Sequence, residues 1–210
     1  NGMPRSAAKS DVQRPVGLES PWVQLRSASG HPFVYRKMIR QADPAAKPGD
    51  VVNVYDKAGE LFGRGLYNPR SQIVVRLLTA GDTPIDETFW RTRLERALAL
   101  RRQLHLDEVT DAYRLVHAEG DGLSGLIAER YADYLVFEVF SLGVYQRCGE
   151  FARLLAELLG PATALDRPGK AGANWHVLVR ADARIEHLGG FHANHTLPPG
   201  TPAQVTIRGH

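Results

Sequence analysis

Three short segments of this 210-residue sequence carry residue types that could bind a cofactor or take part in catalysis. Gly120–Gly125, with the sequence GDGLSG, matches the G-x-G-x-x-G pattern of dinucleotide-binding loops letter for letter. His187, His192 and His195 lie close together in the chain and carry imidazoles of the kind that bind zinc. Cys148, the single cysteine, is the one thiol that could act as a nucleophile. Each pattern needs a particular structural setting before it can do this chemistry.

The residues around these segments favour structural roles. A dinucleotide-binding loop needs a helix directly after its glycines, so that backbone amides and the helix dipole meet the pyrophosphate. Leu126–Tyr131 follows instead with a strand-like composition, and Asp121 would bring a negative charge beside a phosphate. The glycines therefore predict a turn. The histidines have no cysteine or carboxylate at ligand spacing, which favours a solvated loop over a zinc site.

Cys148 lies on the apolar stripe of an expected helix and is predicted to be a small buried hydrophobe. No serine–histidine–aspartate signature, phosphate-binding P-loop or H-E-x-x-H motif is present in the sequence. We therefore expect this chain to contain no catalytic residue, no cofactor-binding residue and no metal site.

The basic residues are concentrated in the first half of the chain. The whole chain has a net charge of +3, but residues 1–104 hold 17 Lys and Arg against 10 Asp and Glu, whereas residues 105–210 hold 9 against 13. A basic half beside an acidic half suggests two units, of which the first faces a polyanion such as a nucleic acid. The alternative is that arginines on a helix simply solvate the protein surface.

Short strand-like runs fill the first unit, and turn signals rich in Gly, Pro, Asn and Asp separate them. Gly63 and Gly65 interrupt one run, as glycines do at a bulge or a tight barrel corner. Five strands in so short a stretch predict a small, strongly curved barrel. The expected strands are Trp22–Arg26, Pro32–Arg36, Val51–Tyr55, Leu61–Leu66 and Gln72–Leu78.

A helix is expected to join this barrel to the second unit. Asp82 or Thr83 can cap it, Pro84 suits its first turn, and its apolar stripe runs from Ile85 to Leu104. The elements expected beyond it are strands at Tyr113–His117, Leu126–Tyr131, Tyr134–Phe140, His176–Arg180 and Gln204–Arg208, and a helix at Val144–Leu159 that Gly160-Pro161 ends. This order predicts an α+β fold: a small β-barrel, a connector helix and a small α+β domain.

The composition is that of a globular protein, with 43% hydrophobic and 23% charged residues. The most apolar stretches, such as Leu135–Val139, which Glu138 interrupts, are far shorter than the roughly 18–20 residues of a membrane span. Asn1–Ser20 lacks the apolar core of a signal peptide. A single cysteine cannot form an internal disulfide, so we expect a cytoplasmic protein. The chain stops directly after a strand-like stretch, and we interpret it as a piece of something longer.

Three stretches resemble one known protein family. Residues 48–55 (PGDVVNVY), 63–73 (GRGLYNPRSQI) and 113–127 (YRLVHAEGDGLSGLI) are similar to the large-subunit ribosomal RNA methyltransferase I family. The resemblance covers about residues 22–210. It departs from the family at residues 31–35, where HPFVY stands in place of the usual His-Pro-Trp-Val-Phe, a conservative aromatic exchange. A larger departure is that the chain stops at His210, where the catalytic domain of the family would begin.

The resemblance implies an S-adenosylmethionine-dependent enzyme that methylates cytosine C5, with a PUA domain, a central α+β domain and a Rossmann-like catalytic domain. In such an enzyme a cysteine attacks cytosine C6, which activates C5 to accept the methyl group. The resemblance places that cysteine and the methyl-donor site in the missing domain. S-adenosylmethionine is therefore the expected cofactor of the full-length protein, none is expected to bind this fragment, and the fragment should be inactive alone.

The expected domain organisation combines the element pattern with this resemblance. Residues 1–20 are expected to form a disordered tail, 21–80 a PUA-like RNA-binding barrel, 81–104 the connector helix, and 105–210 the central α+β domain, cut off before a Rossmann-like methyltransferase domain. The leading hypothesis is the RNA-recognition half of a ribosomal RNA methyltransferase. The alternative is a stand-alone, non-catalytic PUA-type RNA-binding module. The reading frame after His210 would distinguish the two.

Ribosomal RNA is the expected partner, no membrane is expected, and a homodimer is left open. Arg64 lies between two glycines, where backbone can approach a ligand closely, and Asn68 and Arg70 flank the rigid Pro69 turn. The residues predicted to contact RNA are His31, Arg36, Lys37, Arg64, Asn68, Arg70 and Arg76.

Overall fold

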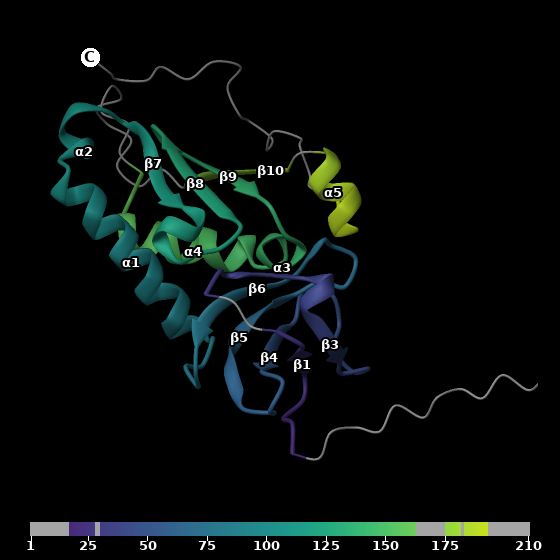
Figure 1. Ribbon diagram of the computed structural model, residues 1–210. Coiled ribbons are helices and arrows are strands. Elements are labelled where there is room, and N and C mark those ends of the chain that lie inside the picture. The colour runs from purple at the N-terminus through teal and green to yellow at the C-terminus, as the bar shows by residue number, and fades with distance from the viewer. Residues whose placement is uncertain (1–16, 28–29, 163–174, 182, 193–210) are drawn as a thin grey trace, which may run out of the picture.

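The computed structural model describes residues 17–27, 30–162, 175–181 and 183–192 (Figure 1). A six-stranded sheet and a four-stranded sheet form two units, which we call the six-stranded unit and the four-stranded unit. Helices α3 (Leu142–Tyr145) and α4 (Cys148–Leu159) lie between the two sheets (Figure 1). The fold is α+β, as the order of elements predicts. Within the described ranges, no helix is long and apolar enough to cross a membrane.

The six-stranded unit is a curled sheet with the strand order β2-β6-β5-β4-β1-β3. Strands β1 and β4 are parallel, and the other neighbours are antiparallel. The strands are β1 (Trp22–Leu25), β2 (Phe33–Tyr35), β3 (Ile39–Ala42), β4 (Val51–Tyr55), β5 (Leu61–Tyr67) and β6 (Ile73–Ala80), and a 3-10 turn, η1 (Arg36–Met38), follows β2. The prediction of five strands missed β3, because its four residues form a strand only by pairing with β1 at an edge of the sheet.

Gly65 is required where β5 and β6 approach each other most closely. The pairing of these strands shifts register between Arg64 and Gly65, as expected of a bulge. A Cβ atom at Gly65 would lie 2.4 Å from the Arg76 carbonyl oxygen and 2.8 Å from Cγ1 of Val75. The glycine therefore allows the sheet to curl tightly at this point.

The connector helix α1 (Glu87–Gln103) begins later than predicted. The predicted caps, Asp82 and Thr83, lie outside it, because Asp86 is the N-cap and its Oδ1 accepts a hydrogen bond from the Phe89 backbone N–H at 2.9 Å. Ile85 consequently precedes the helix. Leu104 at its other end is 59% exposed and does not belong to the buried stripe. A four-residue helix, α2 (Leu106–Val109), follows.

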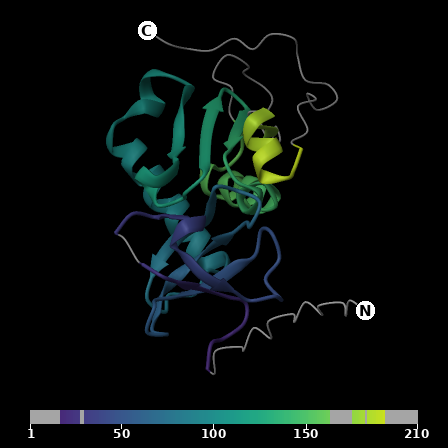
Figure 2. The same ribbon diagram turned by 45° about the vertical axis from the view of Figure 1, so that its right-hand side comes forward.

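The four-stranded unit has the strand order β10-β9-β8-β7, in which β9 and β10 are parallel. Its strands are β7 (Ala112–His117), β8 (Leu126–Tyr131), β9 (Tyr134–Val139) and β10 (His176–Arg180). The predicted hairpin across Ala132-Asp133 is confirmed, with Tyr131 paired to Tyr134 and Ala132 at φ 54°. Helix α5 (Ala183–Gly189), which the sequence patterns did not predict, lies beside this sheet and above the six-stranded unit (Figure 2). The strand predicted at Gln204–Arg208 lies outside the described residues.

The helix predicted over Val144–Leu159 is two helices, α3 and α4. Arg147 leaves helical geometry between them, with φ −103° and ψ 4°. Its guanidinium donates to the carbonyl of Gly143 at 2.8 Å and to that of Gly49, in the six-stranded unit, at 2.9 Å. The break therefore coincides with a contact between the two units. Gly160 ends α4 at φ 74°, as predicted.

Two hydrophobic cores hold the fold together. The six-stranded unit encloses a small core made mainly of valines, among them Val23, Val52 and Val54. The larger core of leucines and aromatic residues lies in the four-stranded unit, around α1 and α4. Leu66 and Leu78 of the six-stranded unit belong to this larger core, which therefore extends across the junction.

Candidate nucleic-acid interface

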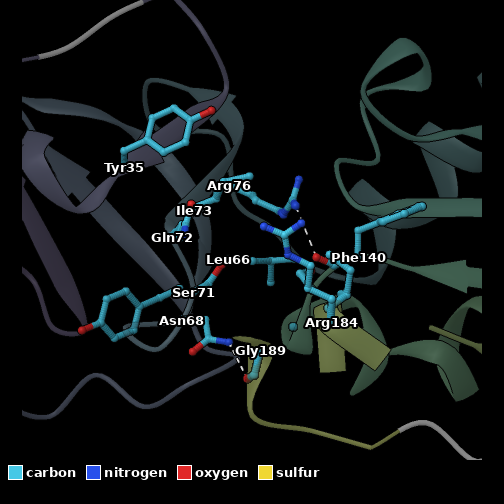
Figure 3. A pocket seen from close by; sticks show the side chains of 14 residues that line it. Tyr35, Leu66, Asn68, Ser71, Gln72, Ile73, Arg76, Phe140, Arg184 and Gly189 are labelled. Carbon is cyan, nitrogen blue, oxygen red and sulfur yellow. Dashed lines mark hydrogen bonds between the residues drawn. The ribbon is translucent and has the colours of Figure 1, made fainter. Parts of the chain in front are cut away.

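A cavity of about 360 Å³ lies where the two units meet (Figure 3). The six-stranded unit contributes strand residues and the loop between β5 and β6, and the four-stranded unit contributes the end of β9, α3 and α5. The lining residues are Tyr35, Leu66, Tyr67, Asn68, Ser71, Gln72, Ile73, Arg76, Phe140, Ser141, Gly143, Arg184, Ile185 and Gly189. The wall mixes aromatic, aliphatic, amide, hydroxyl and guanidinium groups, as expected of a ligand-binding pocket.

The β5–β6 loop is held in place by Asn68. Its Oδ1 accepts a hydrogen bond from the Arg70 backbone N–H at 3.0 Å, which closes the turn locally. Its Nδ2 donates to the Gly189 carbonyl at 2.8 Å and so ties the loop to the end of α5. The backbone N–H of Ser71 donates to the Asn68 carbonyl. These bonds fix the position of Ser71 at the cavity.

Arg76 is 8% exposed and links the two units. Its Nη1 donates to Glu119 Oε1 at 3.2 Å and lies 3.4 Å from Ser124 Oγ. Its Nη2 donates to the Phe140 carbonyl at 3.2 Å, and the guanidinium lies over the Phe33 ring, 4.8 Å from its centroid. Burial lowers the pKa of Arg76, and the charge of Glu119 opposes that shift. The side chain therefore has a structural role at the junction as well as facing the cavity.

An exposed basic and aromatic rim adjoins the cavity. Tyr35 is 40% exposed and is followed by Arg36 and Lys37, which are also exposed, in η1. These three residues and Gln72 line a second, more open hollow of about 390 Å³. Arg36 Nη2 donates to the Pro69 carbonyl, which holds η1 against the β5–β6 loop. Tyr35 and Gln72 line both hollows, so the two lie next to each other.

Arg184 supplies a second guanidinium at the cavity. It is an exposed residue near the start of α5, and Figure 3 shows its side chain rising from the helix toward Arg76. Among the described residues that line the cavity there are two arginines and no carboxylate. Glu119 lies behind Arg76 and offsets part of its charge. The electrostatic character of the cavity favours an anionic ligand.

The structure brings only some of the predicted RNA-binding residues together. Asn68 and Arg76 line the cavity, and Arg36 and Lys37 line the adjoining hollow. Arg70 is exposed beside Asn68 on the same loop. All five belong to, or border, the surface that these two hollows form.

His31 and Arg64 lie elsewhere. His31 lines a separate hollow of about 320 Å³, together with Arg93. Arg64 Nη2 forms an ion pair with Asp82 Oδ1 at 2.6 Å, and its Nε donates to Asn53 Oδ1 at 2.8 Å. Because these bonds engage its guanidinium, the position of Arg64 between two glycines does not by itself make it available to a ligand.

Many residues of this surface were absent from the predicted set, among them Tyr35, Gln72 and Arg184. Tyr35 and Gln72 had a signal in the sequence, because an aromatic or amide side chain next to basic residues suits RNA recognition. Arg184 had none, since it is more than a hundred residues away from the β5–β6 loop in the chain and reaches the cavity only through the fold.

The glycine-rich segment is a turn between strands, as predicted. Residues Ala118–Asp121 form a 3-10 turn, η2, and β8 rather than a helix follows. Asp121 forms two hydrogen bonds of 2.8 Å with Arg101 of the connector helix and accepts a third from the His117 backbone N–H. The carboxylate therefore fastens the turn to α1.

The remaining candidates for chemistry also have structural settings. Cys148 is buried, and burial raises the pKa of its thiol to about 12, which disfavours the thiolate. His192 Nδ1 lies 3.6 Å from Glu186 Oε2, and His195 lies outside the described residues. In the part of the chain that the structure describes, no group of three or more His, Cys, Asp or Glu side chains could hold a metal ion.

Comparison with known proteins defines the class of the first unit and then the family. Residues 23–80 match the PUA-like domain family, so the six-stranded unit is a PUA-like domain. A ribosomal RNA large subunit methyltransferase of Deinococcus radiodurans is 33% identical over 156 residues, which are 72% of this chain and 38% of that protein. Ribosomal RNA large subunit methyltransferase I of Alteromonas mediterranea is 31% identical over 180 residues, which are 85% of this chain and 42% of that protein.

The chain is a homologue of the ribosomal RNA large subunit methyltransferase I family, related to its PUA-containing N-terminal region. It spans about two fifths of the length of these two relatives. The fold matches that of SMU.776, a candidate methyltransferase solved in complex with SAH, with a TM-score of 0.64 and 17% identity over 89% of this chain and 45% of that one. A candidate SAM-dependent methyltransferase from Streptococcus mutans matches with a TM-score of 0.57 and 17% identity, over 76% of this chain and 40% of that one.

Proposed function

We propose that this chain is the RNA-recognition part of an S-adenosylmethionine-dependent methyltransferase that acts on cytosine C5 of large-subunit ribosomal RNA. The observation that carries the proposal is the similarity to large-subunit ribosomal RNA methyltransferases over 85% of the chain. The basic and aromatic surface beside the PUA-like sheet supports it, because unpaired RNA is bound by stacking on aromatic rings and by cations that contact phosphates.

Within this proposal the residues of the rim bind and orient the RNA. Arg36 and Lys37 contact the phosphate backbone, and the exposed ring of Tyr35 offers a face on which a base can stack. Arg76 holds the two units together, so that both sides of the surface keep their relative position.

The described residues do not fit the methyl donor. The glycine-rich segment leads into a strand, Cys148 is buried, and the cavity with its two guanidinium groups disfavours a cationic sulfonium. No step of methyl transfer is therefore assigned to these residues. We assign donor binding and catalysis to a part of the protein beyond this chain.

The proposal is tested by measuring the affinity of the chain for a large-subunit ribosomal RNA transcript and for an unrelated transcript of equal length, across a salt series. We expect preferential binding to the ribosomal RNA. The double variant Arg36→Ala/Lys37→Ala should flatten the log–log salt slope by roughly 0.7 for each lost phosphate contact with single-stranded RNA. Lys57→Ala removes one charge and is the control for a single lost cation away from the surface, because Lys57 is exposed on the β4–β5 turn, at the opposite end of β5 from Asn68. Equal affinity for both transcripts would contradict the proposal.

A separate experiment tests the assignment of donor binding to another part of the protein. Calorimetric titration of the chain with S-adenosylmethionine should give no measurable heat of binding, and micromolar affinity would contradict the assignment of the donor site elsewhere. The reading frame of the parent gene separates the proposal from a stand-alone RNA-binding module. A glycine-rich strand–helix unit downstream supports the methyltransferase.

A further inference from the structure

The more open hollow, beside η1, combines an aromatic ring, an amide and two cations. It is lined by Tyr35, Arg36, Lys37 and Gln72, and its volume of about 390 Å³ falls within the roughly 300–1,000 Å³ of small-ligand pockets. Tyr35 pairs with Ile73 across β2 and β6, and Gln72 directly precedes Ile73 in the chain. The register of the sheet therefore brings Gln72 beside the tyrosine, and Figure 3 shows both on the six-stranded side of the junction.

Two polar side chains of this hollow are available to a ligand. Both Lys37 and Gln72 are exposed. Among the contacts between described residues, none is a hydrogen bond or an ion pair of the Lys37 ammonium or of the Gln72 amide. An amide has a carbonyl acceptor and two donor hydrogens, so it can bond a ligand edge that presents a donor beside an acceptor. The ammonium can contact a phosphate.

The backbone around Tyr35 is held in place by contacts within the PUA-like unit. The Tyr35 N–H donates to Met38 Sδ at 3.5 Å, and Met38 packs against the core of the six-stranded unit. The Arg36 guanidinium donates to the Pro69 carbonyl, which holds η1 against the β5–β6 loop. A site that is already formed in the free protein loses less conformational entropy on binding than a mobile loop would.

An unpaired base suits this hollow, whereas a paired base does not. In an RNA duplex each base is stacked between its neighbours, and its Watson–Crick edge is bonded to the opposite strand. An unpaired base exposes a face for the Tyr35 ring, which is 40% exposed, and an edge for the Gln72 amide. Because the bases place donors and acceptors differently on their edges, one amide bonds some bases better than others.

We propose that this hollow binds one unpaired nucleobase of an RNA strand, which stacks on Tyr35 while the Gln72 amide bonds its edge. Gln72 is then a specificity-determining residue, and Lys37 contacts a neighbouring phosphate. This inference rests on the proposed RNA-recognition function and deepens it, because it names the unpaired base as the ligand and the side chain that distinguishes between bases.

The first test removes the ring from the 210-residue chain. Fluorescence anisotropy follows the binding of a labelled single-stranded RNA of ten nucleotides and of a duplex of the same sequence. Tyr35→Leu should bind the single strand about tenfold more weakly, as expected for one lost stacking contact, with an unchanged salt slope. Tyr35→Phe should stay within about twofold of the original chain, and so should the affinity of both variants for the duplex.

Leu104→Ala is the matched control, because it removes another exposed apolar side chain, at the end of α1. Tyr35 is itself exposed, so its replacement leaves the packing of the core unchanged. If Tyr35→Leu binds the single strand as tightly as Leu104→Ala does, the proposal is overturned. Equal losses in Tyr35→Phe and Tyr35→Leu would also overturn it, since they would assign the effect to the hydroxyl group.

The second test asks whether Gln72 distinguishes between bases. The probes are oligo(A), oligo(C) and oligo(U) of ten nucleotides, in which every register places the same base in the hollow. Gln72→Met removes the amide at unchanged charge and similar size. It should weaken binding of the preferred oligonucleotide about fivefold and of the least preferred one less than about twofold. An equal loss for all three oligonucleotides, or no loss, would overturn the proposal.

The site and the proposed function can fail separately. Undiminished affinity and preference for ribosomal RNA in both Tyr35→Leu and Gln72→Met would support the proposed function and overturn this site. Binding that depends on Tyr35 and Gln72, in a chain with no preference for ribosomal RNA, would support the site and contradict the proposed function.

Discussion

The two units differ in how they are stabilised. The six-stranded unit has a small core made largely of valines, which suits a tightly curled sheet of short strands. The four-stranded unit has a core of leucines and aromatic rings, in which Trp90 lies edge-to-face with Phe151 at 5.4 Å between centroids. Leu66 and Leu78 of the first unit are buried in the second core. The PUA-like unit therefore depends on its neighbour to bury Leu66 and Leu78. Because the two units share this core, the surface between them has a fixed geometry.

The largest expected effect is on the shared core. Phe151→Ala should lower the free energy of unfolding by about 4 kcal/mol, because it removes a fully buried ring. If the junction couples the units, hydrogen exchange of the β4 amides should accelerate together with that of the β8 amides. Loss of protection confined to β8 would show that the two units unfold independently.

The second-largest effect is expected where β5 and β6 of the six-stranded unit approach each other most closely. Gly65→Ala should destabilise the protein by about 3 kcal/mol, because its Cβ would meet the Arg76 backbone. Gly149→Ala is the matched control. Gly149 lies in α4 with open space around its Cβ position, so alanine should stabilise the protein by about 1 kcal/mol. Denaturant unfolding measures both, and equal effects of the two substitutions would contradict the close approach of β5 and β6.

Arg76→Met tests the polar part of the junction. It should cost about 2 kcal/mol, since the Phe140 carbonyl loses a charged donor while Glu119 is exposed enough to be hydrated. Arg96→Met, at an exposed position of α1, should change stability by less than about 0.5 kcal/mol. Thermal unfolding of the two variants side by side gives the comparison. A stability of Arg76→Met equal to that of Arg96→Met would mean that the apolar contacts alone hold the units together.

The smallest expected effect concerns pH and Cys148. Burial raises the pKa of this thiol from 9.0 to about 12, so the folded chain keeps a proton that the unfolded chain releases above about pH 9. Stability contributed by this group is present below pH 9 and is lost as the pH rises toward 12. At pH 10 the loss should be about 1 kcal/mol relative to Cys148→Ala. Urea unfolding of both proteins at pH 8 and pH 10 measures it, and identical pH dependence would show that the thiol is hydrated.

Much of the local structure follows from the sequence alone. The hairpin of β8 and β9 has continuous strand-forming runs on both sides of Ala132-Asp133, and Gly160 ends α4 by adopting a positive φ. The glycines of residues 120–125 could be recognised as a turn because the residues after them do not form a helix. In each case the determining interactions are between residues close together in the chain.

The α+β fold class and the relation to ribosomal RNA methyltransferases could also be predicted from the sequence. The start of α1 was not, since several residues could cap it, and the structure selects Asp86 by its bond to the Phe89 N–H. Nor was the break at Arg147, where a side chain bonds the Gly49 carbonyl of the other unit. Local propensity does not contain such long-range partners.

The candidate site was decided mainly by tertiary structure. Asn68 and Arg76 look like surface residues in the sequence, yet both are buried because their partners are Gly189 and Phe140, which come from the other unit. Arg184 reaches the same cavity from helix α5, more than a hundred residues further along the chain. The sequence by itself determined which residue types and local elements are present. Only the packing of the two units decided which of those residues share one surface, because that depends on contacts between distant parts of the chain.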